Sequence, residues 1–271
     1  MNDVTKLQLK NFGKRFSVAG APETVAVEDL SLEVRRGEFL VIVGPSGCGK
    51  TTVLNVLAGL DTPSSGSVRI DDRAITGPGP DRGVMFQDYA LFPWQTVWGN
   101  VEFGLRHGPA GAGLSVAARA QRVRHTIDLV GLAGSEGKYP NQLSGGMRQR
   151  TALARLIANE PEVLLMDEPL AALDAQTRII LQEELLRIWR QDQPASERRT
   201  VVFITHAIDE AVFLADRIAV MTAHPGRIKL LVDVDLPRPR SDATRSLPEF
   251  QQLTQQIWGL IRDEAYRASV A

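Results

Sequence analysis

The sequence predicts an α/β protein with a mostly parallel sheet, an N-terminal antiparallel β subdomain and an inserted helical subdomain. Continuous apolar runs with helical segments between them are typical of strands buried on both faces of a parallel sheet. These runs are FLVIV (39–43), VLLM (163–166), VVFIT (201–205) and IAVM (218–221). The N-terminal segments LQLKNFGKRFSV and VAVEDLSLEV instead alternate apolar and polar residues, as half-buried antiparallel strands do, and SVRIDDRAI extends this second sheet.

The remaining segments favour helices. Residues from about 88 to 159 combine helical periodicity in RAQRVRHTIDLVGL with the Gly/Pro loop HGPAGAGLS, which predicts the helical insertion. In QTRIILQEELLRIWRQ we expect Ile180, Leu185 and Ile188 to face the core. We therefore predict a main domain over 1–235 and a short tail over 236–271. The tail contains an amphipathic helix whose apolar stripe comprises Phe250, Leu253, Ile257, Leu260 and Ile261.

Composition narrows the possible partners. The 271 residues carry 31 basic and 32 acidic side chains, so net charge gives no argument for nucleic acid or anionic lipid as the main partner. The single cysteine, Cys48, excludes an internal disulfide, and MNDVTKLQLK lacks the features of a signal peptide. No apolar run approaches the roughly 20 residues that cross a bilayer. We expect a cytoplasmic protein whose membrane role, if it has one, goes through a partner.

The segment GPSGCGKTT predicts a phosphate-binding loop. It follows the buried strand FLVIV, precedes the helical run VLNVLAG and fits the pattern G-x-x-x-x-G-K-[ST]. Glycines allow successive N–H groups to point inward, and the following helix adds its positive N-terminal end. Lys50 would bridge the terminal phosphates and the Thr51 hydroxyl would ligate Mg²⁺. The predicted loop residues are Gly44, Pro45, Ser46, Gly47, Cys48, Gly49, Lys50, Thr51 and Thr52.

A second segment, VLLMDEP, supplies what hydrolysis requires. Its buried strand ends in Asp167 and Glu168, at the carboxyl edge where open α/β sheets bind their ligands. We assign Asp167 to the magnesium shell and Glu168 to the orientation and polarisation of the attacking water. The competing interpretation is an acidic pair that caps a helix beginning at Pro169.

Two more polar residues complete the predicted catalytic group. His206 follows the strand VVFIT, where it could contact the terminal phosphate or hold the water and Glu168 in line. Gln87, in VMFQDYALFPW, could join the Mg²⁺ shell or the attacking water through its amide oxygen. The alternatives are a surface histidine and an ordinary polar loop residue.

Five motifs in order resemble the ATPase subunits of ATP-binding cassette (ABC) transporters. They are GPSGCGKTT, FQDYALFPW, LSGGMRQR, LLMDEPLAALD and ITHAIDEA, and the resemblance spans roughly residues 7–232. It implies the ABC ATPase fold around a P-loop NTPase core. It also implies a homodimer that sandwiches two ATP molecules. Each ATP would lie between the phosphate loop of one subunit and the motif LSGGMRQR, called the signature, of the other.

The resemblance assigns further residues. Ser144, Gly145 and Gly146 resemble the signature that contacts the γ-phosphate across the interface, with a helix beginning after them. Asp174 resembles the acid of the loop along that interface. Gln87 resembles the link to the membrane subunit and His206 the switch histidine. Phe16 lies where an aromatic ring stacks on adenine, with Phe12 and a plain sheet-packing role as the alternatives.

Met147 departs from the commonest signature, which has glutamine there. Together with the HPGRI turn and the DLPRPR tail, LSGGMRQR resembles the importer branch for nitrate, alkanesulfonates and taurine. This branch implies transmembrane permease subunits, an extracytoplasmic solute-binding protein as an indirect partner, and a peripheral position on the cytoplasmic face of the plasma membrane. No nucleic-acid partner is expected.

The aromatic segment ALFPWQTVWGNVEFGL has two uses. Phe103 and Leu105 are expected to pack within the helical insertion, while an exposed Phe-Pro-Trp, including Trp94, favours a groove for a permease helix.

Two other classes of cassette ATPase fit the sequence less well. A DNA-repair cassette would contain long heptad coils, which this sequence lacks. A cassette translation factor would carry two cassettes and a basic linker, whereas this sequence has one set of motifs and a nearly neutral charge. An exporter or another importer class stays open.

Overall fold

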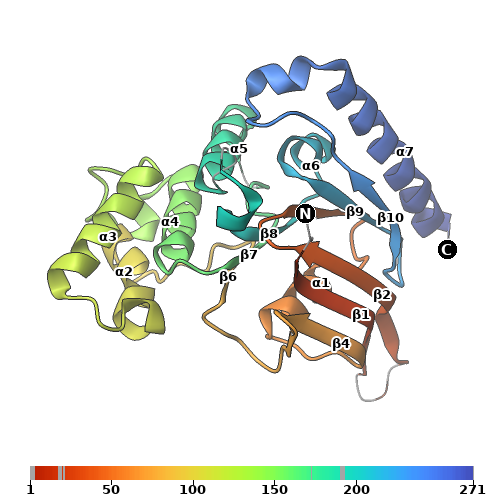
Figure 1. Ribbon diagram of the computed structural model, residues 1–271, viewed down its shortest axis with the longest axis horizontal. Coiled ribbons are helices and arrows are strands. Elements are labelled where there is room, and N and C mark those ends of the chain that lie inside the picture. Colours follow the sequence, from red (N-terminus) through yellow and green to blue (C-terminus); the bar gives the residue numbers. More distant parts are fainter. Residues whose placement is uncertain (1–3, 18–19, 21, 172, 190–192, 271) are drawn as a thin grey trace.

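Two β-sheets and a lateral group of helices make up the computed structural model, which describes residues 4–17, 20, 22–171, 173–189 and 193–270 (Figure 1). The helices α2, α3 and α4 lie to one side of both sheets, and α7 runs along the opposite side of the molecule (Figure 1). This arrangement confirms the predicted fold class.

The smaller sheet is antiparallel, with the strand order β2-β1-β4-β5. Along β2 the apolar residues Leu30, Leu32 and Val34 are buried and the residues between them are exposed, as the alternating pattern predicts. The strands are β1 (Thr5–Phe16), β2 (Thr24–Arg35), β4 (Ser65–Ile70) and β5 (Arg73–Ala74).

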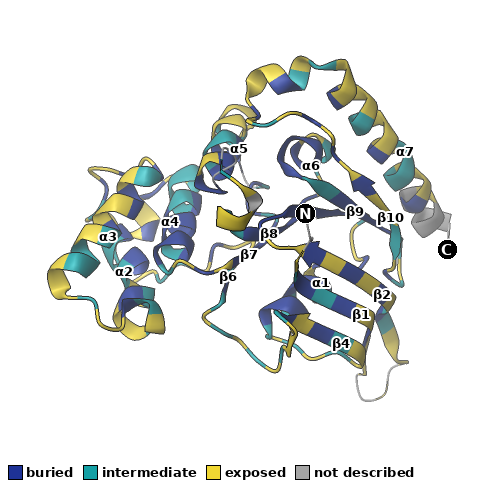
Figure 2. Ribbon diagram, in the orientation of Figure 1, coloured by how far each residue is buried: buried dark blue, intermediate teal, exposed yellow. Residues whose placement is uncertain are grey.

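The larger sheet has the strand order β10-β9-β3-β8-β7-β6. All neighbouring pairs are parallel except β10 with β9, so the sheet is mostly parallel. Every residue of β3, β7 and β8 is buried, which explains their continuous apolar sequences (Figure 2). The strands are β3 (Phe39–Val43), β6 (Arg82–Met85), β7 (Val163–Asp167), β8 (Thr200–Ile204), β9 (Arg217–Met221) and β10 (Ile228–Asp233).

Strand β3 separates two hydrophobic cores. Phe39, Val41 and Val43 face the core shared with α2 to α7, whereas Leu40 and Ile42 face the core shared with the small sheet. Helix α1 (Lys50–Ala58) contacts strands of both sheets and fills the second core. The first residue of α1 is therefore held at a junction of two rigid layers.

The helical insertion lies between β6 and β7. Its helices are α2 (Val97–His107), η1 (Pro109–Gly111), α3 (Val116–Leu129), η2 (Pro140–Gln142) and α4 (Gly145–Ala158). Thr96, Ser115 and Ser144 cap α2, α3 and α4 through side-chain oxygens that accept backbone N–H groups. Leu105 is buried here as expected, but Phe103 is 40% exposed, because its ring stacks on Phe92 at the surface instead of entering the core.

The remaining helices are α5 (Ala175–Trp189), η3 (Ala195–Glu197), α6 (Ile208–Leu214), η4 (Asp242–Ser246) and α7 (Pro248–Val270). Leu185 and Ile188 of α5 are buried, but Ile180 is 46% exposed, since its neighbour Leu181 takes the core-facing position. Phe250 and Ile257 of α7 are buried in the core of the main domain, and the rest of the apolar stripe packs against it. Among the described residues, no helix is both long enough and apolar enough to cross a membrane.

Arg240 ties the tail to the core. The residue is 3% exposed. Its guanidinium donates to the carbonyl oxygens of Val212, Phe213 and Ala215, at the end of α6, and to that of Val234. Burial and the neighbouring Arg238 lower the pKa of Arg240 to about 9, so the side chain is still charged at neutral pH. The cation closes a helix end whose last carbonyls have no partner within the helix.

We expect Arg240→Met to lower the free energy of unfolding by roughly 2–4 kcal/mol, because the buried carbonyls lose their donor. Urea denaturation followed by circular dichroism measures this change. The matched control is Arg262→Met on α7, whose side chain is 65% exposed and which should change stability by less than about 0.5 kcal/mol. Equal effects of the two substitutions would contradict the assignment.

Candidate functional site

The phosphate loop connects β3 to α1 through backbone that only glycine adopts easily. Gly47 and Gly49 have φ angles of 75° and 93°, and Gly49 caps α1. A Cβ at Gly49 would lie 2.7 Å from a methyl carbon of Val27, so β2 fits against the loop too closely for any side chain there. Lys50 is 8% exposed, and its ammonium donates to the carbonyl oxygens of Gly44 (2.9 Å) and Pro45 (2.8 Å), which hold it over the loop.

Cys48 is the buried underside of this loop. Its side chain is fully buried, and burial raises the pKa of its thiol although the Lys50 charge opposes this shift. A protonated, inaccessible thiol is a poor nucleophile. This agrees with the interpretation of Cys48 as a plain occupant of the loop.

Asp167 and Glu168 diverge at the end of β7. Asp167 is 8% exposed and accepts a hydrogen bond from the Thr51 hydroxyl. Burial raises the pKa of Asp167, with the Thr51 hydrogen bond opposing the shift. Glu168 has a φ of 46°, in the left-handed region that non-glycine residues rarely adopt, and its N–H donates to Ile204 O (3.0 Å). The chain therefore turns sharply between the two acids, and each meets a different partner.

The Glu168 carboxylate contacts His206. The Nδ1 atom of His206 lies 3.1 Å from Oε2 of Glu168, and the imidazole is 63% exposed. The loop that carries His206 is fixed by its neighbours. The Thr205 hydroxyl donates to the buried Glu210 (2.6 Å) and accepts from Ala207 N (3.0 Å). The contact joins the carboxyl ends of β7 and β8, as expected from their parallel pairing.

Thr51, Gln87 and Asp167 line one open cleft of about 690 Å³, together with Phe86, Asp88 and Ala171. Hydroxyl, amide and carboxylate oxygens are hard ligands, and Mg²⁺ takes few protein ligands when a nucleotide supplies the rest. The donor set therefore fits magnesium. A divalent cation would also offset the cost of keeping the buried Asp167 ionised.

A second cavity of about 370 Å³ adjoins the phosphate loop and extends to Glu168. The loop residues Ser46 to Thr52 line it, and so do Thr24 and Ala26 of β2. Phe16, 42% exposed, pairs with Thr24 in the β-ladder, whereas Phe12 is fully buried in the core. Phe16 does not itself line the cavity, but its ring is exposed and its ladder partner Thr24 lines it, so of the two aromatic candidates only Phe16 has a ring available for stacking.

The signature residues lie elsewhere. Ser144 is exposed, and its hydroxyl accepts from Met147 N (3.3 Å) at the start of α4. The helix begins at Gly145, so both glycines belong to its first turn and do not precede it. Asp174 caps α5 by accepting from Thr177 N (2.9 Å). Hydrogen bonds from the backbone and side chain of Thr177 lower the pKa of Asp174. Neither cavity described above includes Ser144, Gly145, Gly146 or Asp174.

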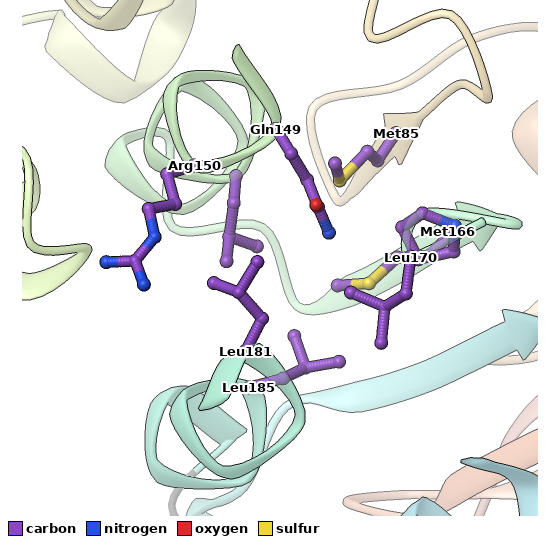
Figure 3. A pocket seen from close by; sticks show the side chains of 9 residues that line it. Met85, Gln149, Arg150, Met166, Leu170, Leu181 and Leu185 are labelled. Carbon is purple, nitrogen blue, oxygen red and sulfur yellow. The ribbon is translucent and has the colours of Figure 1, made fainter. Parts of the chain in front are cut away.

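A later part of helix α4 nevertheless lies close to the carboxyl end of β7. The Gln149 amide points into a small cavity between α4, α5 and the end of β7, lined by Met85, Met166 and Leu170 among others (Figure 3). Gln149 is 3% exposed, and within the described part of the chain its Oε1 has no hydrogen-bond partner.

Sequence reasoning missed His224. This exposed residue lies in the turn between β9 and β10 and lines the cavity at the phosphate loop. Strand β9 neighbours β3, and both are parallel, so the residues after both strands emerge at the same edge. That rule identifies the turn as part of the site, whereas the HPGRI motif taken alone indicates only a branch of the family.

Comparison with known proteins defines the family. Residues 27–171 match the family model described as ABC transporter. An uncharacterized ABC transporter ATP-binding protein of Methanocaldococcus jannaschii is 49% identical over 97% of this chain and 94% of its own length. The aliphatic sulfonates import ATP-binding protein of Bacillus licheniformis is 46% identical over 92% of this chain and 89% of its own length. The nitrate import ATP-binding protein of Synechocystis is 42% identical over 96% of this chain and 94% of its own length.

Solved structures agree. A bacterial ABC transporter cassette in dimeric form has a TM-score of 0.74 and 32% identity, covering 84% of this chain and 98% of that one. A post-hydrolysis dimer of an ATP-binding cassette with bound ADP and Pi gives a TM-score of 0.73 with the same identity and coverage. The chain belongs to the ABC transporter family and is an ATP-binding ATPase subunit whose ATP hydrolysis is coupled to transport.

Proposed function

We propose that this chain is the ATPase subunit of an importer for a small solute such as nitrate, an alkanesulfonate or taurine. The sulfonate and nitrate importers among its relatives support this branch. The subunit would work as a homodimer on the cytoplasmic face of the plasma membrane. It would bind two transmembrane permease subunits and respond indirectly to an extracytoplasmic solute-binding protein.

The contact between Glu168 and His206 carries the proposal for hydrolysis. Glu168 lines the cavity at the phosphate loop, where its carboxylate would accept a proton from the attacking water. His206, 3.1 Å away, would fix the orientation of that carboxylate and reach the terminal phosphate. Lys50 would turn from the loop carbonyls to the β- and γ-phosphates, since an anion offers a stronger acceptor.

Thr51 and Asp167 would hold Mg²⁺, with Gln87 at the open side of the same cleft. Bound magnesium supplies charge neutralisation at the β- and γ-phosphates. Because Gln87 lies in the segment between β6 and α2, a ligand at Gln87 would connect the nucleotide to the helical insertion. Gln87 would then lie between the nucleotide and the contact with the membrane subunit.

The signature residues support a dimer. Ser144, Gly145 and Gly146 form the exposed or half-exposed start of α4, where the first N–H groups of a helix have no partner within the helix, and they do not line the cavity at their own phosphate loop. They would complete the site of a second copy, and Asp174 at the start of α5 would lie along the same interface.

A groove of about 480 Å³ supports the permease contact. Phe86, Phe92 and Phe103 line it together with the stem of Arg155, between the segment after β6 and helices α2 and α4. Trp94 is 70% exposed, and its ring lies 5.6 Å from that of Phe92. Exposed aromatics beside an apolar groove are typical anchors for a partner helix.

We expect Glu168→Gln to lower steady-state ATP hydrolysis by about 100-fold or more, because the amide cannot accept the proton of the attacking water. The variant should accumulate as an ATP-bound dimer in size-exclusion chromatography. Glu249→Gln, an exposed glutamate in the first turn of α7, is the matched control and should hydrolyse normally. Near-normal turnover in Glu168→Gln would remove Glu168 from the catalytic role.

We expect Trp94→Ala to weaken co-purification with the permease subunits more than it weakens ATP binding, because the ring lies on the docking face and outside the nucleotide cavity. Pull-down and ATP titration measure the two effects. Trp258→Ala, on the exposed side of α7, controls for loss of a surface tryptophan. Unchanged co-purification in Trp94→Ala would argue against this docking face.

A further inference from the structure

His224 lies where the nucleotide site is otherwise built from β2 and the phosphate loop. The cavity that it lines also includes Thr24 and Ala26 of β2, and Glu168. Its imidazole is an exposed group with two nitrogen atoms that can donate or accept hydrogen bonds.

The turn that presents His224 is held by its own backbone and by β2. Thr222 closes the turn, since its hydroxyl donates to Pro225 O and accepts from Arg227 N, both at 3.0 Å. Gly226 then joins β2: its N–H donates to Ala26 O (2.9 Å), and its carbonyl accepts from Glu28 N (3.0 Å).

Gly226 also fixes the turn against the phosphate loop. A Cβ at this position would overlap the Cys48 carbonyl oxygen, so the two backbones are in direct contact. Any change in the position of the turn must therefore be accommodated by the loop, and the reverse holds as well.

A third restraint comes from α7. Glu264, 3% exposed, accepts a hydrogen bond from Ala223 N (3.1 Å) and forms an ion pair with Lys229 of β10 (2.8 Å). Ala223 directly precedes His224. The C-terminal helix thus holds the backbone immediately beside the residue that faces the cavity.

We propose that His224 contacts the bound nucleotide at its ribose and α-phosphate, and that Glu264 positions His224 for this contact. The inference rests on the proposed nucleotide site. Lys50, Thr51 and Glu168 serve the terminal phosphates there, which leaves the other end of the nucleotide to the β2 side. The turn is bonded to β2 at Ala26, next to Thr24 and the exposed Phe16, so His224 lies toward the nucleoside.

We expect His224→Ala to weaken ATP binding about five- to tenfold, the loss of one hydrogen bond to a charged or polar ligand. Calorimetric titration with ATP and Mg²⁺, in the non-hydrolysing Glu168→Gln background, measures the affinity. In the wild-type background KM for ATP should rise and kcat should stay within twofold, because the groups at the terminal phosphates are intact. His125→Ala, an exposed histidine of α3, is the matched control.

The role of Glu264 is tested by a double-mutant cycle. Glu264→Ala should weaken ATP binding about threefold when His224 is present and have no effect in the His224→Ala background, because its effect passes through His224. Glu264→Gln retains an oxygen for Ala223 N and should bind ATP normally. Thermal unfolding of each variant shows whether α7 stays folded.

Unchanged ATP affinity in His224→Ala would overturn the contact, and equal effects of Glu264→Ala in both backgrounds would overturn the positioning role. Lys50→Ala separates this failure from that of the proposed site. If Lys50→Ala abolishes binding while His224→Ala does not alter it, only the His224 inference fails. If Lys50→Ala binds ATP normally, the proposed site itself is wrong.

Discussion

The phosphate loop is in backbone contact with two other elements, and this contact determines the rest of the site. Gly49 lies against β2, and Gly226 lies against the carbonyl of Cys48, with no room for a side chain at either glycine. The loop is thereby clamped between the small sheet, the β9–β10 turn and the N-terminus of α1. Because the small sheet and the large sheet meet there, the spacing of the two layers sets the shape of the anion-binding loop.

Parallel pairing then gathers the chemistry at one edge. Strands β3, β8 and β7 are adjacent and parallel, so their carboxyl ends lie at the same edge of the sheet. The phosphate loop with Lys50 follows β3, His206 follows β8, and Asp167 ends β7. The signature residues Ser144, Gly145 and Gly146, at the start of α4, line neither of the two cavities at this edge. The division explains why a signature with no acid or base is compatible with an ATPase: the chain holds the reactive groups in one place and presents helix N–H groups in another.

Much of this organisation is readable from the sequence, because it depends on periodicity and chain order. The buried strands, the loop between β3 and α1, and the acids after β7 follow from apolar runs and from residues adjacent in sequence. The prediction for Ile180 is wrong because helical periodicity alone does not tell which of two neighbouring apolar residues faces the core. The prediction for Phe103 is wrong because its ring packs against Phe92 at the surface, a contact outside the helix that periodicity does not record. Glu264 meets the backbone of Ala223, the residue before His224, through tertiary packing across 41 residues of sequence, which no local pattern records.

The burial of Cys48 has a practical consequence. It is the only thiol in the chain, its side chain is fully covered, and its pKa is raised. Alkylating reagents therefore react only when the loop separates from β2 and the β9–β10 turn, and the rate of modification becomes a direct measure of that local opening. A cysteine introduced at the surface would be the sole fast-reacting position, so the native sequence is already a background for attaching a single spectroscopic label.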